Sequence, residues 1–363
     1  MLTALLVIGI LVLLIVVHEL GHFVAAKLSG VKVEEFGVGY PPRAFTLGKF
    51  GGTEYTLNWI PFGGFVRLFG DAGEGEHGRG SLVDAPRWKQ ALILVAGVAM
   101  NALTAWILFA VAFHIGVPQP TDALMPGEEA RIIIADVVPG SPAFAAGLSP
   151  GDVLVDIADQ DGVHVGELTP DTVVAFVGNH VGEPIDVTFT HAGEKKEATI
   201  IPAQGVLEAE AGKPALGVAL VLVVNRSEPW GTALRDAYFA TLDTFQDVFH
   251  AISVLVGRLT SGHPSLSGMV GPVGIVGYVH DASQNGFGAV LVLAAIISVN
   301  LSIFNLIPIP ALDGGRLATL GVEAILRRAA PRLAMQALNA LGVAFIVLLM
   351  IVVTYQDILR LIA

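Results

Sequence analysis

Four long apolar stretches dominate the hydrophobic pattern of the chain. They run over residues 1–26, 91–117, 287–306 and 337–354. A helix needs about 20 mostly apolar residues to cross the roughly 30 Å hydrocarbon core of a bilayer, so each stretch predicts a transmembrane helix.

Three other patterns lie between these helices. Residues 27–90 alternate glycine, aromatic and β-branched residues between turns, which predicts a membrane-associated β-hairpin region. Residues 126–204 predict a small α+β domain, with helices beginning at Ser141-Pro142 and Thr169-Pro170. The linker 205–286 holds a segment, 232–259, whose apolar residues recur at helical spacing opposite charged ones. We expect it to be an amphipathic helix on the outer surface or on the bundle.

Composition supports a polytopic membrane protein. Of the 363 residues, 53% are hydrophobic and only 14% charged, with mean hydropathy +0.69, whereas about a quarter of the residues in soluble domains are charged. The net charge of −12 argues against nucleic-acid binding, which needs a basic face. The absence of cysteine excludes thiolate zinc sites and cysteine nucleophiles.

The distribution of basic residues predicts how the chain is oriented in the membrane. Lys and Arg concentrate in residues 27–89 and 308–336, whereas residues 118–240 are strongly acidic. Basic loops stay on the cytoplasmic side, so the hairpin region is predicted inside and the α+β domain outside.

The first apolar stretch contains an H-E-x-x-H motif, His18 to His22. Positions i and i+4 share one helix face, so both imidazoles can bind one zinc ion, with Glu19 placed to take a proton from water. Ionisable groups inside an apolar helix are energetically costly and are usually functional. The alternative is two histidines and a glutamate that satisfy one another in a bundle core.

A catalytic zinc site takes a third protein ligand. Asp313 follows the third predicted span. With four spans in total, Asp313 and His22 lie at the same side of the membrane, whereas a fifth span would place them at opposite sides. We therefore predict Asp313 as the third ligand, within a domain 287–315. Pro308 and Pro310 break the helix before it and expose backbone to a substrate. Two asparagines could donate hydrogen bonds to substrate, or could instead join helices: Asn300 and Asn305.

These motifs resemble those of the site-2 protease family of intramembrane zinc metalloproteases, in its bacterial regulated-intramembrane-proteolysis branch. The resemblance rests on HELGH at 18–22 and N-x-x-P-x-P-x-L-D-G-G at 305–315. In the segment from Ala96 to Asn101, Val98 stands where the family usually has proline. The resemblance implies that 126–204 is a single external PDZ domain, which binds chain ends or screens bulky substrates.

The predicted fold is thus α-helical and polytopic, with four transmembrane helices, a β-hairpin region and one α+β PDZ domain. The predicted function is zinc-dependent cleavage of transmembrane segments, with Glu19 catalytic and one Zn²⁺ on His18, His22 and Asp313. The resemblance implies single-span substrates, such as anti-sigma factors already trimmed by another protease or remnant signal peptides, in the bacterial inner membrane, with the site near the cytoplasmic side. Two alternatives are a non-proteolytic PDZ scaffold with a vestigial metal site and a metal transporter.

Overall fold

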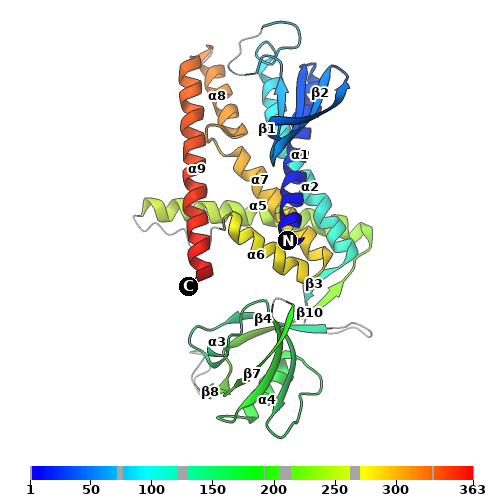
Figure 1. The fold of residues 1–363 in the computed structure, drawn as a ribbon, viewed down its shortest axis with the longest axis vertical. Helices are drawn as coiled ribbons and strands as arrows, with labels where there is room; N and C mark the ends of the chain where they lie inside the picture. Colours follow the sequence, from blue (N-terminus) through cyan, green and yellow to red (C-terminus); the bar gives the residue numbers. More distant parts are fainter. Residues whose placement is uncertain are drawn as a thin grey trace. The chain divides into compact units, whose positions relative to one another are not determined.

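A computed structural model describes residues 2–71, 77–121, 130–191, 193–204, 214–261, 270–328 and 331–362 (Figure 1). The chain divides into two compact units. Unit 1 comprises Met1–Val111, Pro229–Val279 and Val290–Ala363, and unit 2 comprises Ala112–Glu228 and His280–Ala289. Parts of the predicted segments 27–90, 126–204 and 205–286 lie outside the described residues.

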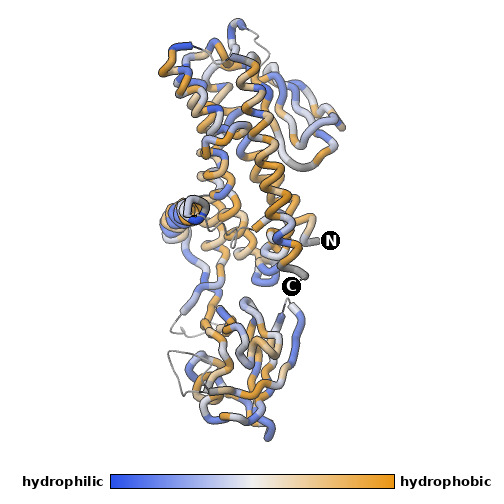
Figure 2. Tube along the Cα trace, turned by 90° about the vertical axis from the view of Figure 1, so that its left-hand side faces the viewer, coloured by the Kyte–Doolittle hydropathy of each residue, from blue (hydrophilic) through white to orange (hydrophobic). Residues whose placement is uncertain are grey.

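Four helices of the described chain are long and apolar enough to cross a membrane, as predicted. They are α1 (Leu2–Ser29), α2 (Arg87–Ile115), α7 (Phe287–Leu306) and α9 (Arg332–Ile362). Figure 2 shows hydrophobic residues along their lengths. Three of them, α1, α2 and α9, extend past a predicted bound, because helical hydrogen bonding continues through the polar residues at which an apolar stretch stops. The length and apolar composition of these four helices make this a multi-pass membrane protein.

The predicted hairpin region is formed by two long strands, β1 (Val33–Phe50) and β2 (Thr53–Leu68). The first part of β1 lies between two parts of β2, so Phe36 is opposite Val66 on one side and Tyr55 on the other. The ring of Phe23 on α1 packs edge-on against Phe36, with 5.5 Å between centroids. This contact fixes the sheet against the helix that carries the H-E-x-x-H motif.

Three further helices belong wholly or mainly to unit 1: α5 (Trp230–Thr260), α6 (Pro272–Gln284) and α8 (Asp313–Leu326). The helix α5 includes the segment 232–259 and is not among the candidate spans of the described helices. In Figures 1 and 2 it lies across the direction of α7 and α9. That direction is the one expected of an interfacial helix.

Unit 2 contains the predicted α+β domain. Its sheet has the strand order β3-β10-β4-β5-β6-β7, and the strands are β3 (Val117–Pro120), β4 (Ala130–Val137), β5 (Val153–Asp159), β6 (Ile185–His191), β7 (Glu194–Ile200) and β10 (Val218–Arg226). Two short strands, β8 (Ala203–Gln204) and β9 (Pro214–Ala215), pair separately. The main sheet continues past residue 204, the predicted limit, because β10 inserts between β3 and β4.

The two predicted helix starts of unit 2 are both capped. Ser141 accepts the N–H of Phe144 at the start of α3 (Pro142–Ala145). Thr169 and Thr172 form a capping box at the start of α4 (Pro170–Asn179). These caps satisfy N–H groups that have no partner inside the helix. Because Ser and Thr are preferred at such positions, the Ser-Pro and Thr-Pro pairs predict the two helix starts from the sequence.

Candidate metal centre

The helix α1 supplies two imidazoles that face the same point. His18 and His22 are one turn apart and each is only 7% exposed. Their Nε2 atoms lie 3.1 Å from each other. The i, i+4 spacing of the motif alone accounts for this alignment, since both side chains project from one face of the helix.

The third group comes from the other end of the chain. Asp313, the first residue of α8, places Oδ2 3.0 Å from the Nε2 of His18 and 3.0 Å from that of His22. The backbone leaves helical geometry between α7 and α8, where Ala311 has a positive φ of 78°. This break turns the chain so that Asp313 reaches the two histidines.

The three donor atoms fit a zinc ion by number, chemistry and spacing. Two imidazole nitrogens and a carboxylate oxygen are ordinary zinc ligands, and three protein ligands are typical of a catalytic site. Tetrahedral ligands about 2.0–2.1 Å from zinc lie roughly 3.3 Å from one another. The observed separations of 3.0–3.1 Å are close to that value.

Helix α2 packs directly against the two histidine rings. The Nδ1 of His22 donates to the backbone carbonyl of Ile93 at 2.8 Å, which leaves Nε2 without a proton and free to bind a metal. A Cβ at Gly97 would lie 2.5 Å from His22 Nε2 and 2.8 Å from His18 Cε1. Only glycine lets α2 approach the two rings this closely.

Glu19 is beside the triad and is covered by the hairpin. It is partly exposed, and the backbone N–H of Val66 on β2 donates toward its carboxylate. A Cβ at Gly64 would lie 3.3 Å from the Cγ of Glu19, in tight contact. Burial raises the pKa of the Tyr40 phenol on β1, and the Glu19 carboxylate raises it further, so the hydroxyl stays protonated.

The remaining predicted residues lie before Asp313. Asn300 is partly exposed, and its Nδ2 donates to the Ile296 carbonyl one turn earlier on α7. Asn305 is partly exposed near the end of the same helix. Pro308 and Pro310 lie in the non-helical segment, and a side chain at Gly342 of α9 would overlap the Pro310 carbonyl. Within the described part of the chain, these four residues make no hydrogen bond to His18, His22 or Asp313.

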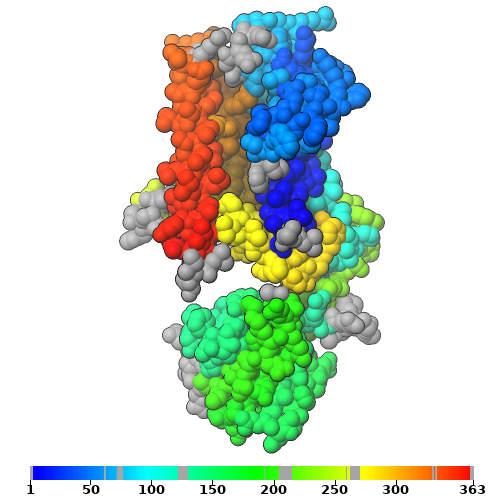
Figure 3. Space-filling view, in the orientation of Figure 1, coloured from blue at the N-terminus to red at the C-terminus, as the bar shows by residue number. Residues whose placement is uncertain are grey.

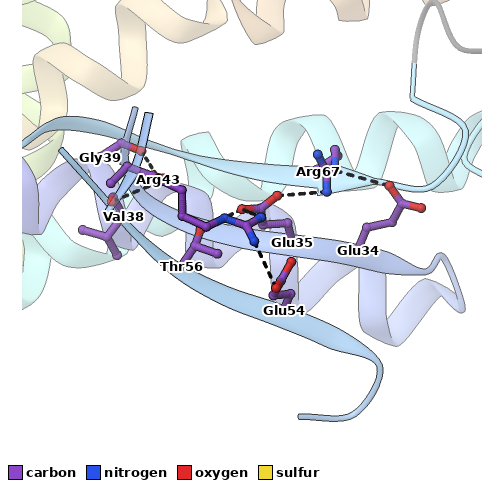
Figure 4. Close-up of polar contacts among 9 residues, drawn as sticks. Glu34, Glu35, Val38, Gly39, Arg43, Glu54, Thr56 and Arg67 are labelled. Carbon is purple, nitrogen blue, oxygen red and sulfur yellow. Dashed lines mark hydrogen bonds and ion pairs between the residues drawn. The ribbon is translucent and has the colours of Figure 1, made fainter. Parts of the chain in front are cut away.

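The hairpin carries an ion network centred on one buried carboxylate (Figure 4). The Glu35 side chain is 4% exposed. Its carboxylate binds Arg43 at 2.8 Å, Arg67 at 2.9 Å and the Thr56 hydroxyl at 2.8 Å. Arg43 also pairs with Glu54 at 3.1 Å. The network joins parts of β1 and β2 that are distant along the chain, and so it fixes the strands that lie over Glu19.

Comparison with known proteins gives the family. The model of Peptidase family M50 matches residues 6–349. This chain belongs to peptidase family M50. It is accordingly a zinc metalloprotease of that family, and the two motifs on which the predicted resemblance rested lie within the matched residues.

Relatives of this M50 protein align along nearly its whole length. A Clostridium perfringens protein, whose name gives it as a candidate zinc metalloprotease, is 33% identical over 95% of both chains. The zinc metalloprotease RasP of Oceanobacillus iheyensis is 27% identical over 96% of both. Among solved structures, the PDZ domain of an SdrC-like protein from Listeria monocytogenes is 18% identical, with TM-score 0.21, and covers 28% of this chain and 93% of its own.

Several supporting groups were not predicted from the sequence: the Ile93 carbonyl, the Val66 N–H and the close approach of Gly97. A backbone carbonyl has no sequence signature, because every residue carries one. Gly97 lies in the segment from Ala96 to Asn101, but its contact with the rings depends on how α1 and α2 pack.

Proposed function

We propose that this protein is an intramembrane endopeptidase, with one Zn²⁺ held by His18, His22 and Asp313 and with Glu19 as the catalytic base. The observation that carries the proposal is the close triangle of His18 Nε2, His22 Nε2 and Asp313 Oδ2 beside Glu19, with both histidines and Glu19 on a helix apolar enough to span a membrane. The same three groups on a solvated surface would not indicate a proteolytic site within a membrane.

The chemistry divides between the ion and the protein. Bound zinc would polarise the scissile carbonyl and make water acidic enough to attack it at neutral pH. The Glu19 carboxylate takes the proton from the attacking water and later gives a proton to the leaving amine. The Val66 N–H orients the carboxylate for both steps.

The substrate must be extended at the point of cleavage. A helical peptide hides its bonds within the helix, whereas an exposed strand edge can hold an unwound peptide by backbone hydrogen bonds. Figure 3 shows a recess in unit 1 between α9 and the hairpin, with α7 at its back. We infer that an unwound transmembrane segment enters there, with Asn300, Asn305 and the backbone around Pro308 and Pro310 contacting it.

Sidedness and substrates follow from charge and family resemblance. The basic hairpin region is cytoplasmic, unit 2 is external and the site is near the cytoplasmic face of a bacterial inner membrane. Unit 2 acts as a PDZ domain that binds chain ends or excludes bulky proteins. The substrates are single-span proteins or peptides, such as anti-sigma factors trimmed by an upstream protease or remnant signal peptides.

Cleavage of a single-span substrate by the purified full-length protein tests the activity. We expect Glu19→Gln to abolish cleavage and keep stoichiometric zinc, because the amide cannot accept the proton. Glu167→Gln, at an exposed glutamate of unit 2, is the matched control and should cleave as wild type does. Cleavage by Glu19→Gln at the wild-type rate, or zinc-loaded wild type without activity, would refute the proposal.

The absence of cysteine allows a clean test of sidedness. Single cysteines at Lys49 in the hairpin and Lys195 in unit 2 would be treated with a membrane-impermeant maleimide on intact cells. We expect labelling at 195 only, with labelling at 49 after the membrane is opened. The reverse labelling pattern would show that the predicted membrane orientation is inverted, and it would leave the proposed proteolytic activity unaffected.

A further inference from the structure

The metal centre requires a particular tautomer of His18. Its Nε2 faces His22 and Asp313 at 3.1 and 3.0 Å, so this nitrogen must be free of a proton when it binds a metal. The proton of the neutral ring then resides on Nδ1 and needs an acceptor. His22 has such an acceptor in the Ile93 carbonyl, and His18 needs a counterpart.

The group opposite His18 Nδ1 is the side-chain amide of Asn101 on α2. Asn101 is fully buried, and its Nδ2 lies 3.3 Å from His18 Nδ1. The other end of the amide, Oδ1, is buried without a hydrogen-bond partner among the described residues. A half-turn of the amide exchanges the two ends, so that the oxygen faces Nδ1 and accepts its proton. After this rotation the amide oxygen accepts the Nδ1 proton of His18, so both of these atoms have a hydrogen-bond partner.

The backbone around Asn101 is held firmly enough for this role. The Ser298 hydroxyl on α7 donates to the Asn101 carbonyl at 2.8 Å, and the Ser302 hydroxyl donates to the Val98 carbonyl at 3.0 Å. Both serines are fully buried. These bonds join α2 to α7, the helix that leads to Asp313, and so hold the amide at a set distance from His18.

We propose that Asn101 is a positioning residue whose side-chain oxygen accepts the Nδ1 proton of His18 and leaves Nε2 free for the metal. The inference rests on the proposed zinc centre and deepens it. An outer group of this kind orients the ring and makes the ligating nitrogen more basic, and its loss typically lowers metal affinity on the order of 10–100-fold.

Zinc affinity of the full-length protein in detergent, measured by competition with a chromophoric chelator, tests the role. We expect Asn101→Leu to lower the affinity on the order of 10–100-fold. The same variant should change the visible spectrum of the Co²⁺-substituted protein, which reports ligand geometry. Asn101→Asp keeps an acceptor oxygen and removes the donor, so it should retain most of the affinity. If leucine prevents folding, Asn101→Ala removes the same oxygen and replaces it in the comparison.

Ser302→Ala is the matched control, because it removes another buried hydrogen bond between α2 and α7 without touching His18. Equal losses in Ser302→Ala and Asn101→Leu would show that helix packing is responsible and would overturn the inference. Unchanged affinity in Asn101→Leu, or a large loss in folded Asn101→Asp, would also overturn it. A wild-type protein that binds no zinc would instead overturn the metal centre itself.

Discussion

Gly97 on α2 lies against the rings of His18 and His22, and replacing it by alanine tests how closely the metal centre is packed. The new Cβ would lie 2.5 Å from His22 Nε2, whereas ordinary contact begins at 3.4 Å. The nitrogen, the Cβ or both must therefore shift by 3.4 − 2.5 = 0.9 Å in total. A metal site tolerates deviations of only about 0.2 Å in its ligand distances.

This displacement is several times larger than the tolerance, so we expect Gly97→Ala to lose zinc binding rather than merely weaken it. Overpacking of this kind costs about 1–3 kcal/mol of folding free energy, and a misplacement of about 1 Å costs on the order of 10²-fold in rate. The helix would still form, because alanine has the higher helix propensity.

Zinc content, chelator competition and substrate cleavage in the purified protein provide the assay. The control is Gly9→Ala on α1, where an added Cβ meets nothing within 4 Å. It should leave zinc binding and cleavage as in the wild type. If Gly97→Ala binds zinc with wild-type affinity and cleaves at the wild-type rate, the packing argument is refuted.

Three further predictions concern the stability of elements outside the metal centre. Asp357 on α9 is 3% exposed, and its carboxylate accepts hydrogen bonds from the N–H groups of Gly271 (3.2 Å) and Gly274 (2.8 Å) at the start of α6. Asp357→Ala removes both acceptors, so it should destabilise α6 by about 2 kcal/mol. The loss would be measured as faster amide hydrogen exchange in α6. Unchanged exchange in α6 would contradict this. Glu35→Gln should speed exchange in the hairpin and leave zinc affinity unaltered, because it weakens only the ion network; a loss of zinc would show that the network supports the metal directly. Ile157 in the core of unit 2 is fully buried, so Ile157→Ala should cost about 2–5 kcal/mol of that unit's stability in thermal unfolding, and a shift confined to unit 1 would be the contrary result.

Local and one-dimensional features were predictable from the sequence. The four spans follow from the length of apolar stretches, and the alignment of His18 with His22 follows from helix geometry over a single turn. Asp313 was predicted across 295 positions because zinc needs a third ligand and only a four-span count brings that carboxylate to the same side.

The groups that support the site were decided by tertiary structure alone. His22 meets the Ile93 carbonyl 71 positions away, and His18 meets Asn101 83 positions away. Such pairs depend on the angle and depth at which α1, α2 and the hairpin pack, and a shift of one helical turn would replace every partner. Sequence spacing determines which face of a helix a side chain occupies, whereas the packing of whole elements determines what that face meets.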